Sequence, residues 1–169
     1  PIICGHSHGG MLAARHAAET PTAPALVIMS GHGGGAGIMD RIAGSGLMSG
    51  ARHKELTARA REFVAAGKGD TLMQFPGWWY VATAESFLDY SDNLPDTVAL
   101  AARIKCPTLF LRGDLEPAGL YPGEAFVANS GGRAELKLLP CGSRARERVT
   151  PPPRAPSSTK FSAPIRGRV

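Results

Sequence analysis

The sequence has few of the features that mark membrane proteins, disulfide-stabilised proteins or zinc proteins. No apolar run reaches the roughly 18 residues that a membrane-spanning helix needs. The first residues, Pro1 to Cys4, have neither the basic start nor the long apolar stretch of a signal peptide. We therefore expect a cytoplasmic protein with no membrane partner. The three cysteines, Cys4, Cys106 and Cys141, are not paired at metal-ligand spacing, so neither a disulfide framework nor a zinc site is predicted.

Histidine is also scarce, and all five histidines lie at or before His53. The rest of the chain therefore offers no imidazole to act as a general base or as a metal ligand. What is present suits a globular protein, because the apolar fraction of 43% is near the average for folded domains. The length of 169 residues fits a single domain.

The net charge of +5 comes from the end of the chain. Seven basic residues and a single acidic residue, Glu147, follow residue 140, so residues 1–140 are close to neutral. The same tail is rich in proline and serine, and such a composition cannot bury a core. We predict a globular body over 1–140 and a disordered basic tail over 141–169. Because the tail lacks a recognisable motif, no specific nucleic-acid partner is expected.

Short apolar runs alternate with helix-forming segments along the body. Runs typical of buried strands occupy 1–4, 25–29, 108–111 and 134–139, and helices are expected at 11–20, 54–66, 95–104 and 121–129. Such alternation predicts a mostly parallel sheet covered by helices. Residues 38–104 are expected to be helical in several pieces, with a break near the Pro-Gly pair at 76–77.

The first strand is followed by the pattern Gly5-x-Ser7-x-Gly9, which leads directly into a helix. A serine between two glycines, where a strand turns sharply into a helix, is typical of a nucleophile elbow. The tight turn strains the serine backbone and lifts its Oγ above the sheet. There the backbone N–H of His8 would face a developing oxyanion, which the helix dipole also favours. An ordinary turn with a helix-capping serine is the alternative interpretation.

Two segments of the sequence resemble the α/β-hydrolase superfamily in its lipase-like and esterase-like form. One is the elbow with its helix, residues 5–13, and the other is the segment 106–117, which resembles the seventh strand of that fold and its acid loop. The resemblance implies a partial α/β-hydrolase fold over 1–140, with strands five to eight and a helical cap over about 38–104. It also implies a serine hydrolase that acts on an ester or similar acyl bond of a small molecule and needs no metal or other cofactor.

The resemblance also implies an acid partner for Ser7. A serine hydroxyl is a poor nucleophile until a base takes its proton, and a carboxylate must orient that base. In this family the chain order is serine, acid, histidine, and the acid usually lies three residues after the glycine that ends strand seven. Counting from Gly113 gives Glu116, and Asp114 is the alternative.

The family's catalytic histidine should follow strand eight, close after Pro140. The sequence reads Cys141-Gly142-Ser143-Arg144 there, so we expect impaired activity. A shift of the reading frame near codon 141 and a genuine lineage-specific tail both remain open as explanations. A non-catalytic, hydrolase-like protein that binds a small molecule is the alternative function.

One of the other histidines is a candidate to substitute for the missing base. His32 follows the second strand and should lie beside Ser7, so it is considered as a replacement. His6 and His8 flank the elbow and are expected to diverge from it, while His16 and His53 fit helix surfaces. The glycine-rich segment 31–37 is expected to be a flexible loop into the cap.

Two further expectations concern surfaces. The cap contains an aromatic cluster, which suits either an apolar acyl pocket or the cap's own core: Phe75, Trp78, Trp79, Tyr80, Phe87 and Tyr90. The resemblance places the chain in the C-terminal part of the fold, so its first strand should lie at an edge of the sheet. An exposed apolar edge strand favours pairing with another chain, and self-association through that edge is therefore expected.

Overall fold

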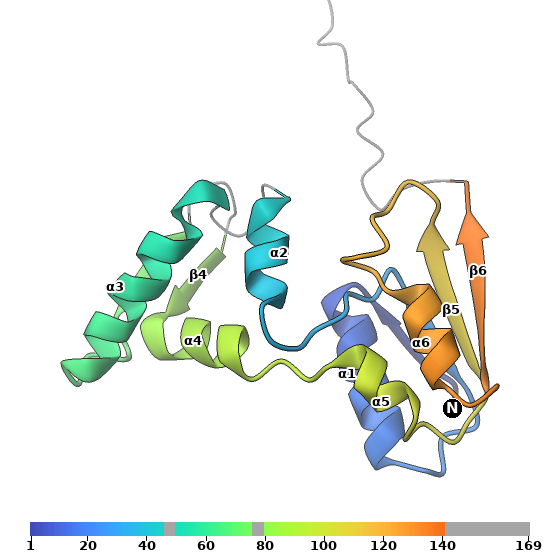
Figure 1. Cartoon of the computed structure of the whole chain (residues 1–169). Helices are drawn as coiled ribbons and strands as arrows, with labels where there is room; N and C mark the ends of the chain where they lie inside the picture. The colour runs from blue at the N-terminus through green and yellow to red at the C-terminus, as the bar shows by residue number, and fades with distance from the viewer. Residues whose placement is uncertain (46–49, 76–79, 141–169) are drawn as a thin grey trace, which may run out of the picture.

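The computed structural model describes residues 1–45, 50–75 and 80–140. These residues form two lobes (Figure 1), which we call the sheet lobe, residues 1–37 and 95–140, and the cap, residues 38–94. The chain enters the cap after the second strand of the sheet and returns before the third. The cap is thus an insertion between two neighbouring strands.

The sheet lobe is built on a four-stranded parallel sheet. Its strands, in spatial order, are β1 (Ile3–His6), β2 (Leu26–Met29), β5 (Thr108–Gly113) and β6 (Ala134–Leu139). Each neighbouring pair is parallel, which confirms the mostly parallel sheet expected from the sequence. β1 pairs with β2 alone among the described strands, so it lies at an edge of this sheet.

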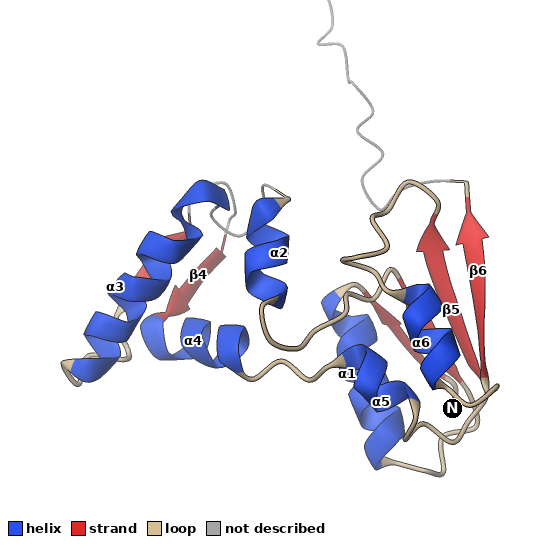
Figure 2. Ribbon diagram, viewed as in Figure 1, coloured by secondary structure: helices blue, strands red, loops and turns tan. Residues whose placement is uncertain are grey.

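Three helices lie on one side of the sheet (Figure 2): α1 (His8–Glu19), α5 (Thr97–Ala101) and α6 (Gly123–Asn129). The strands follow one another in space in the same order as in the sequence. Right-handed crossovers that always advance in one direction place their helices on the same face. The core between them contains Ile28 and Phe110, both fully buried, and alanines of α1 that let the helix approach closely.

The cap combines helices with a short hairpin. Its elements are α2 (Ile38–Gly44), the 3-10 turn Gly50–Arg52, α3 (His53–Ala65), β3 (Leu72–Phe75), β4 (Tyr80–Thr83) and α4 (Ala84–Asp92). β3 and β4 pair in antiparallel fashion, and this hairpin was not predicted from the sequence. Its strands have four residues each, and the proline and glycine between them indicated only a break.

Two further sequence expectations need correction. Helix α5 and the residues up to Ile104 were assigned to the cap, but they pack on α1 and α6 in the core of the sheet lobe because Leu100, Ala101 and Ile104 are buried there. His53 was expected on a helix surface, yet it is buried in the cap with its ring 5.8 Å from that of Phe87. No helix within the described ranges has the length and apolarity to cross a membrane.

The burial of the sheet core predicts that two matched substitutions change the free energy of unfolding by different amounts. Ile28 is 0% exposed and Ile2 is 61% exposed, so Ile28→Val leaves a cavity while Ile2→Val does not. We expect Ile28→Val to lower the free energy of unfolding by about 1 kcal/mol and Ile2→Val by less than about 0.5 kcal/mol. Urea denaturation followed by circular dichroism measures both. Equal losses in the two variants would contradict the packing described here.

Candidate active site

Ser7 occupies the turn that joins β1 to α1. Its backbone has φ 53° and ψ −119°, a conformation that residues other than glycine rarely adopt. The turn is held from both sides, because Ser7 N–H donates to Met29 O at 2.9 Å and Ser7 O accepts from Gly10 N–H at 3.0 Å. The strained strand-turn-helix geometry expected for a nucleophile elbow is therefore present at Ser7.

The two glycines of the pattern, Gly5 and Gly9, have different steric surroundings. A side chain at Gly5 would overlap the carbonyl oxygen of Gly9 and crowd Ala13, so the turn cannot close around a larger residue there. A Cβ at Gly9 would meet no atom within 4 Å. The close approach of strand and helix thus requires the first glycine, whereas space alone does not require the second.

The carboxyl ends of the strands bring the candidate residues to one edge of the sheet. Hydrogen bonds continue the parallel ladder just past the strand ends, from Ser7 N to Met29 O, from Ser30 N to Leu111 O at 2.8 Å, and from Asp114 N to Leu139 O at 2.8 Å. Ser7, Ser30 and the loop after β5 consequently leave the sheet at the same edge. This is the edge where open α/β sheets bind their ligands.

Glu116 is the buried carboxylate of this edge. It is 6% exposed, and its Oε2 accepts hydrogen bonds from Ser30 Oγ at 2.8 Å and from the Gly113 N–H at 2.9 Å. Asp114, the other candidate, is exposed. The described contacts therefore favour Glu116 over Asp114 as the acid, because two donors hold its carboxylate in a fixed orientation.

Ser30, which supports Glu116 from the end of β2, was not predicted from the sequence. Ser30 also has a positive φ, 46°, so its backbone is strained at the point where it faces the acid. A serine after an apolar run carries no signal of such a role. Its partner lies 86 residues away along the chain, and only the register of β2 and β5 brings the two together.

An ion pair fixes the loop that carries Glu116. Arg112 is 5% exposed, and both of its terminal nitrogens donate to the Glu124 carboxylate at 2.6 Å. Arg112 also donates to Tyr121 O at 3.0 Å. The hydrogen bond from Arg112 lowers the pKa of Glu124 below its ordinary value. The end of β5 is thereby tied to the start of α6, on both sides of the acid loop.

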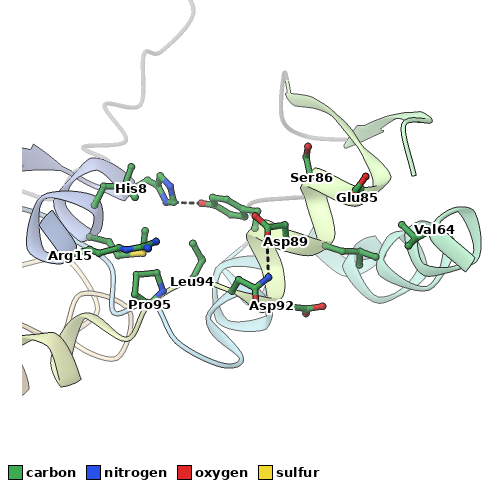
Figure 3. A pocket seen from close by; sticks show the side chains of 14 residues that line it. His8, Arg15, Val64, Glu85, Ser86, Asp89, Asp92, Leu94 and Pro95 are labelled. Carbon is green, nitrogen blue, oxygen red and sulfur yellow. Dashed lines mark hydrogen bonds between the residues drawn. The ribbon is translucent and has the colours of Figure 1, made fainter. Parts of the chain in front are cut away.

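A second polar group joins the elbow to the cap. His8 Nδ1 lies 3.2 Å from His32 Nε2 and 3.1 Å from the Tyr90 hydroxyl on α4, and Figure 3 shows His8 reaching toward this helix. The Gly34 N–H donates to His32 Nδ1 at 3.2 Å. Burial, together with the smaller effect of the neighbouring His8, lowers the pKa of His32 to about 4. Burial also lowers the pKa of His8.

The segment around His32 is packed, which corrects the expectation of a flexible loop. His32, Gly33 and Gly34 are buried. Hydrogen bonds pin Gly33 through its N–H to Leu120 O at 2.9 Å and through its carbonyl to Thr97 N at 2.8 Å. Both ring nitrogens of His32 are engaged by Gly34 and His8. The geometry therefore does not favour His32 as a substitute base for Ser7.

A cleft of about 730 Å³ lies between α1 and α4 beside this group. Figure 3 shows that it is lined by His8 and Arg15 from α1 and by acidic residues of α4, among them Asp89 and Asp92. Ser7 and Glu116 do not line it. The cleft thus flanks the elbow and is not itself the place where an acyl group would meet Ser7.

The aromatic residues of the cap do not form a single cluster, because some lie in the cap core and Tyr90 contacts His8. Phe75 and Phe87 are buried in the cap core with ring centroids 4.5 Å apart, so they fill the cap and do not line an acyl pocket. Tyr90 contacts His8 instead. Trp78, Trp79 and the Tyr80 side chain lie outside the described residues, as does the tail 141–169. In the described ranges, no three histidine, cysteine, aspartate or glutamate side chains are grouped to hold a metal ion.

Comparisons with known proteins address the fold. No family model matches the chain, and no curated protein matches its sequence. Among solved structures, Est1E from Butyrivibrio proteoclasticus is 17% identical with a TM-score of 0.51, over 81% of this chain and 50% of that chain. Est1E with bound ferulic acid gives 18% identity and the same TM-score, over 82% and 49%. An alpha/beta hydrolase from Sphaerobacter thermophilus gives 17% identity and a TM-score of 0.41, over 82% and 59%.

The likeness to Est1E shows the fold of the chain and no more than the fold. The chain spans about half the length of Est1E. The matched part includes most of this chain, so the parallel sheet and its helices share the arrangement of a larger known fold. Roles of single residues rest on the geometry described above.

The buried His32 predicts a pH dependence of stability. Its pKa is lowered to about 4 in the folded chain, from about 6.5 in an unfolded chain, so folding favours the neutral ring. The stabilisation is complete above pH 6.5 and is lost as the pH falls toward 4, by about 3 kcal/mol. His32→Gln cannot be protonated and should lack this component.

Urea denaturation of both proteins between pH 4 and 7 measures the difference. Carboxylates titrate in the same range, but they are common to the two proteins and cancel in the comparison. We expect the wild type to lose more stability than His32→Gln as the pH falls. If the free energy of unfolding fell equally with pH in both proteins, His32 would not be held neutral by its surroundings.

Proposed function

We propose that this chain, whose fold is that of the α/β hydrolases, is a serine hydrolase acting on an ester or similar acyl bond of a small molecule. The observation that carries the proposal is the strained backbone of Ser7 in the turn between β1 and α1. That conformation presents the serine at the N-terminus of a helix, at the carboxyl edge of the sheet. A helix-capping serine would not explain it, because Ser7 makes no side-chain cap hydrogen bond.

In the proposed reaction Ser7 Oγ attacks the acyl carbon while a base takes its proton. The carbonyl oxygen becomes a tetrahedral oxyanion, which the backbone N–H of His8 would stabilise at the start of α1. The leaving group departs with a proton and leaves an acyl group on Ser7. A water molecule then attacks the acyl carbon while the base takes its proton. Ser7 Oγ leaves with that proton, and the acid is released.

Glu116 is proposed to orient the base. Ser30 and the Gly113 N–H hold its carboxylate, and β6 ends beside it because Gly113 pairs with Leu139. β6 therefore ends next to the acid loop, and the resemblance to the α/β-hydrolase family leads us to expect the histidine just after this strand. The sequence supplies no histidine there. Since members of a triad act as a unit, loss of the base costs about 10⁶-fold in rate, and we expect little turnover.

Chemical rescue tests this assignment. Free imidazole should replace the missing base beside Ser7, so p-nitrophenyl ester hydrolysis by the wild type should rise with imidazole concentration beyond the imidazole background. Ser7→Ala should show the background alone. Glu116→Gln should reduce the rescue, because an amide cannot stabilise an imidazolium as a carboxylate does.

Asp114→Asn is the matched control for the acid. It changes an exposed carboxylate two residues away from Glu116 and should keep the rescue. If Asp114→Asn loses the rescue and Glu116→Gln keeps it, the acid has been assigned to the wrong residue. Hydrolysis that is unchanged in Ser7→Ala would reject the proposed nucleophile.

A non-catalytic binding protein is the second candidate, and the missing histidine favours it. Such a protein would bind a small acyl compound with an affinity that Ser7→Ala leaves unchanged, and imidazole would give it no Ser7-dependent hydrolysis. The two candidates therefore give opposite results in the rescue experiment. In both cases a cytoplasmic location stays an expectation from the sequence.

Self-association through β1 belongs to the same proposal. β1 lies at an edge of the described sheet, Ile2 beside it is 61% exposed, and Cys4 is exposed. Free backbone groups of an edge strand can pair with another chain. We expect dimers or larger species of the purified chain in size-exclusion chromatography with light scattering. A stable monomer at high concentration would contradict this expectation.

A further inference from the structure

Side chains from two other segments meet at His8. Tyr90 comes from α4 of the cap, and His32 comes from the loop after β2. Their rings also pack on His8, with centroids 4.8 Å and 5.5 Å from its own. His8 itself directly follows Ser7, so these contacts tie the cap and the buried loop to the residue whose backbone N–H faces the proposed oxyanion.

The hydrogen-bond donors fix where the ring protons lie. A backbone N–H can only donate, so the Gly34 N–H makes His32 Nδ1 an acceptor, and the proton of a neutral His32 lies on Nε2. Nε2–H then donates to His8 Nδ1. His8 Nδ1 is therefore also an acceptor, and Tyr90 donates its hydroxyl proton to the same nitrogen. The proton of His8 is left on Nε2.

We propose that Tyr90 and His32 are positioning residues that hold His8, and through it the oxyanion donor beside Ser7, in one orientation. The catalytic part of this inference rests on the proposed function, whereas the arrangement of the protons does not. Two donors aimed at Nδ1 disfavour a half-turn of the His8 ring, because that turn would put the Cδ2–H group, which accepts no hydrogen bond, in the place of Nδ1. The cap is thereby coupled to the elbow through α4.

Charged groups surround this cluster without bonding to its ring nitrogens. Arg15 of α1 and Glu85, Asp89 and Asp92 of α4 line the cleft beside His8. Arg41 of α2 donates to Gly34 O at 3.3 Å. The two imidazoles, His32 buried and His8 partly buried, stay neutral next to these charged side chains, because their hydrogen bonds use the Nδ1 atom of each ring as an unprotonated acceptor.

Nitrogen NMR of the full chain, labelled with ¹⁵N at histidine, tests the arrangement directly. At pH 7 we expect His8 and His32 to carry their protons on Nε2, with both Nδ1 signals typical of hydrogen-bonded acceptors. His32→Leu should shift His8 toward the Nδ1–H form, because Tyr90 can then accept that proton. His32→Gln keeps a donor in the same place and should restore the Nε2–H form of His8.

A separate variant tests the hydrogen bond between Tyr90 and His8. Tyr90→Phe removes one donor and should move the His8 Nδ1 signal while His32 stays unchanged. Tyr121→Phe is the matched control, because its hydroxyl makes no hydrogen bond to a described residue and its loss should leave both rings unchanged. A proton on His8 Nδ1 in the wild type, or a His8 signal that neither His32→Leu nor Tyr90→Phe alters, would overturn the proposal.

Imidazole-supported ester hydrolysis tests the catalytic consequence. Tyr90→Phe and His32→Leu should each lower the Ser7-dependent rate about fivefold, the factor that corresponds to one neutral hydrogen bond, and His32→Gln should retain most of it. Rates equal to the wild type in both variants, with altered NMR signals, would overturn the positioning role. If the wild type itself shows no Ser7-dependent hydrolysis, the proposed function fails, and the proton arrangement is still decided by the NMR spectra.

Discussion

The parallel register of β1, β2 and β5 is the constraint on which the site depends. Parallel strands end at a common edge, so each loop that follows a strand begins beside the next. Ser7, Ser30 and Glu116 come from three such loops. A slip of one residue in β2 would turn Ser30 away from Glu116 and would also move Ile28 out of the core. The same hydrophobic pattern that packs the sheet against its helices therefore sets the geometry of the polar edge.

Most of the sheet lobe could be predicted from the sequence because its signals are local. The runs that became β1, β2, β5 and β6 are short, apolar and bounded by turn residues, and the elbow pattern follows the first of them directly. The resemblance to the α/β-hydrolase family indicated Glu116 by counting from Gly113, with Asp114 as the alternative. These features need no knowledge of distant contacts.

The features that the sequence did not reveal depend on contacts between distant segments. Ser30 matters because of a residue in another loop, and α5 belongs to the sheet lobe because its apolar face meets α1 and α6. His53 was misjudged because a histidine in a charged helix looks exposed until Phe87 covers it. The hairpin of β3 and β4 is too short for a pattern of alternation to stand out. In each case packing, rather than local propensity, decided the outcome.

The proposed acid, Glu116, is held by contacts that do not depend on a base. Ser30, Gly113 and the ion pair of Arg112 with Glu124 fix the acid loop, and none of these contacts involves a histidine. The strained turn at Ser7 is likewise held by β2 and by α1. A chain can therefore keep an intact elbow and a buried, oriented carboxylate when no histidine follows β6. The stability of this edge of the sheet is therefore independent of the base. A well-formed geometry at Ser7 and Glu116 does not by itself indicate turnover, and the chemistry must be judged from the groups that reach Ser7.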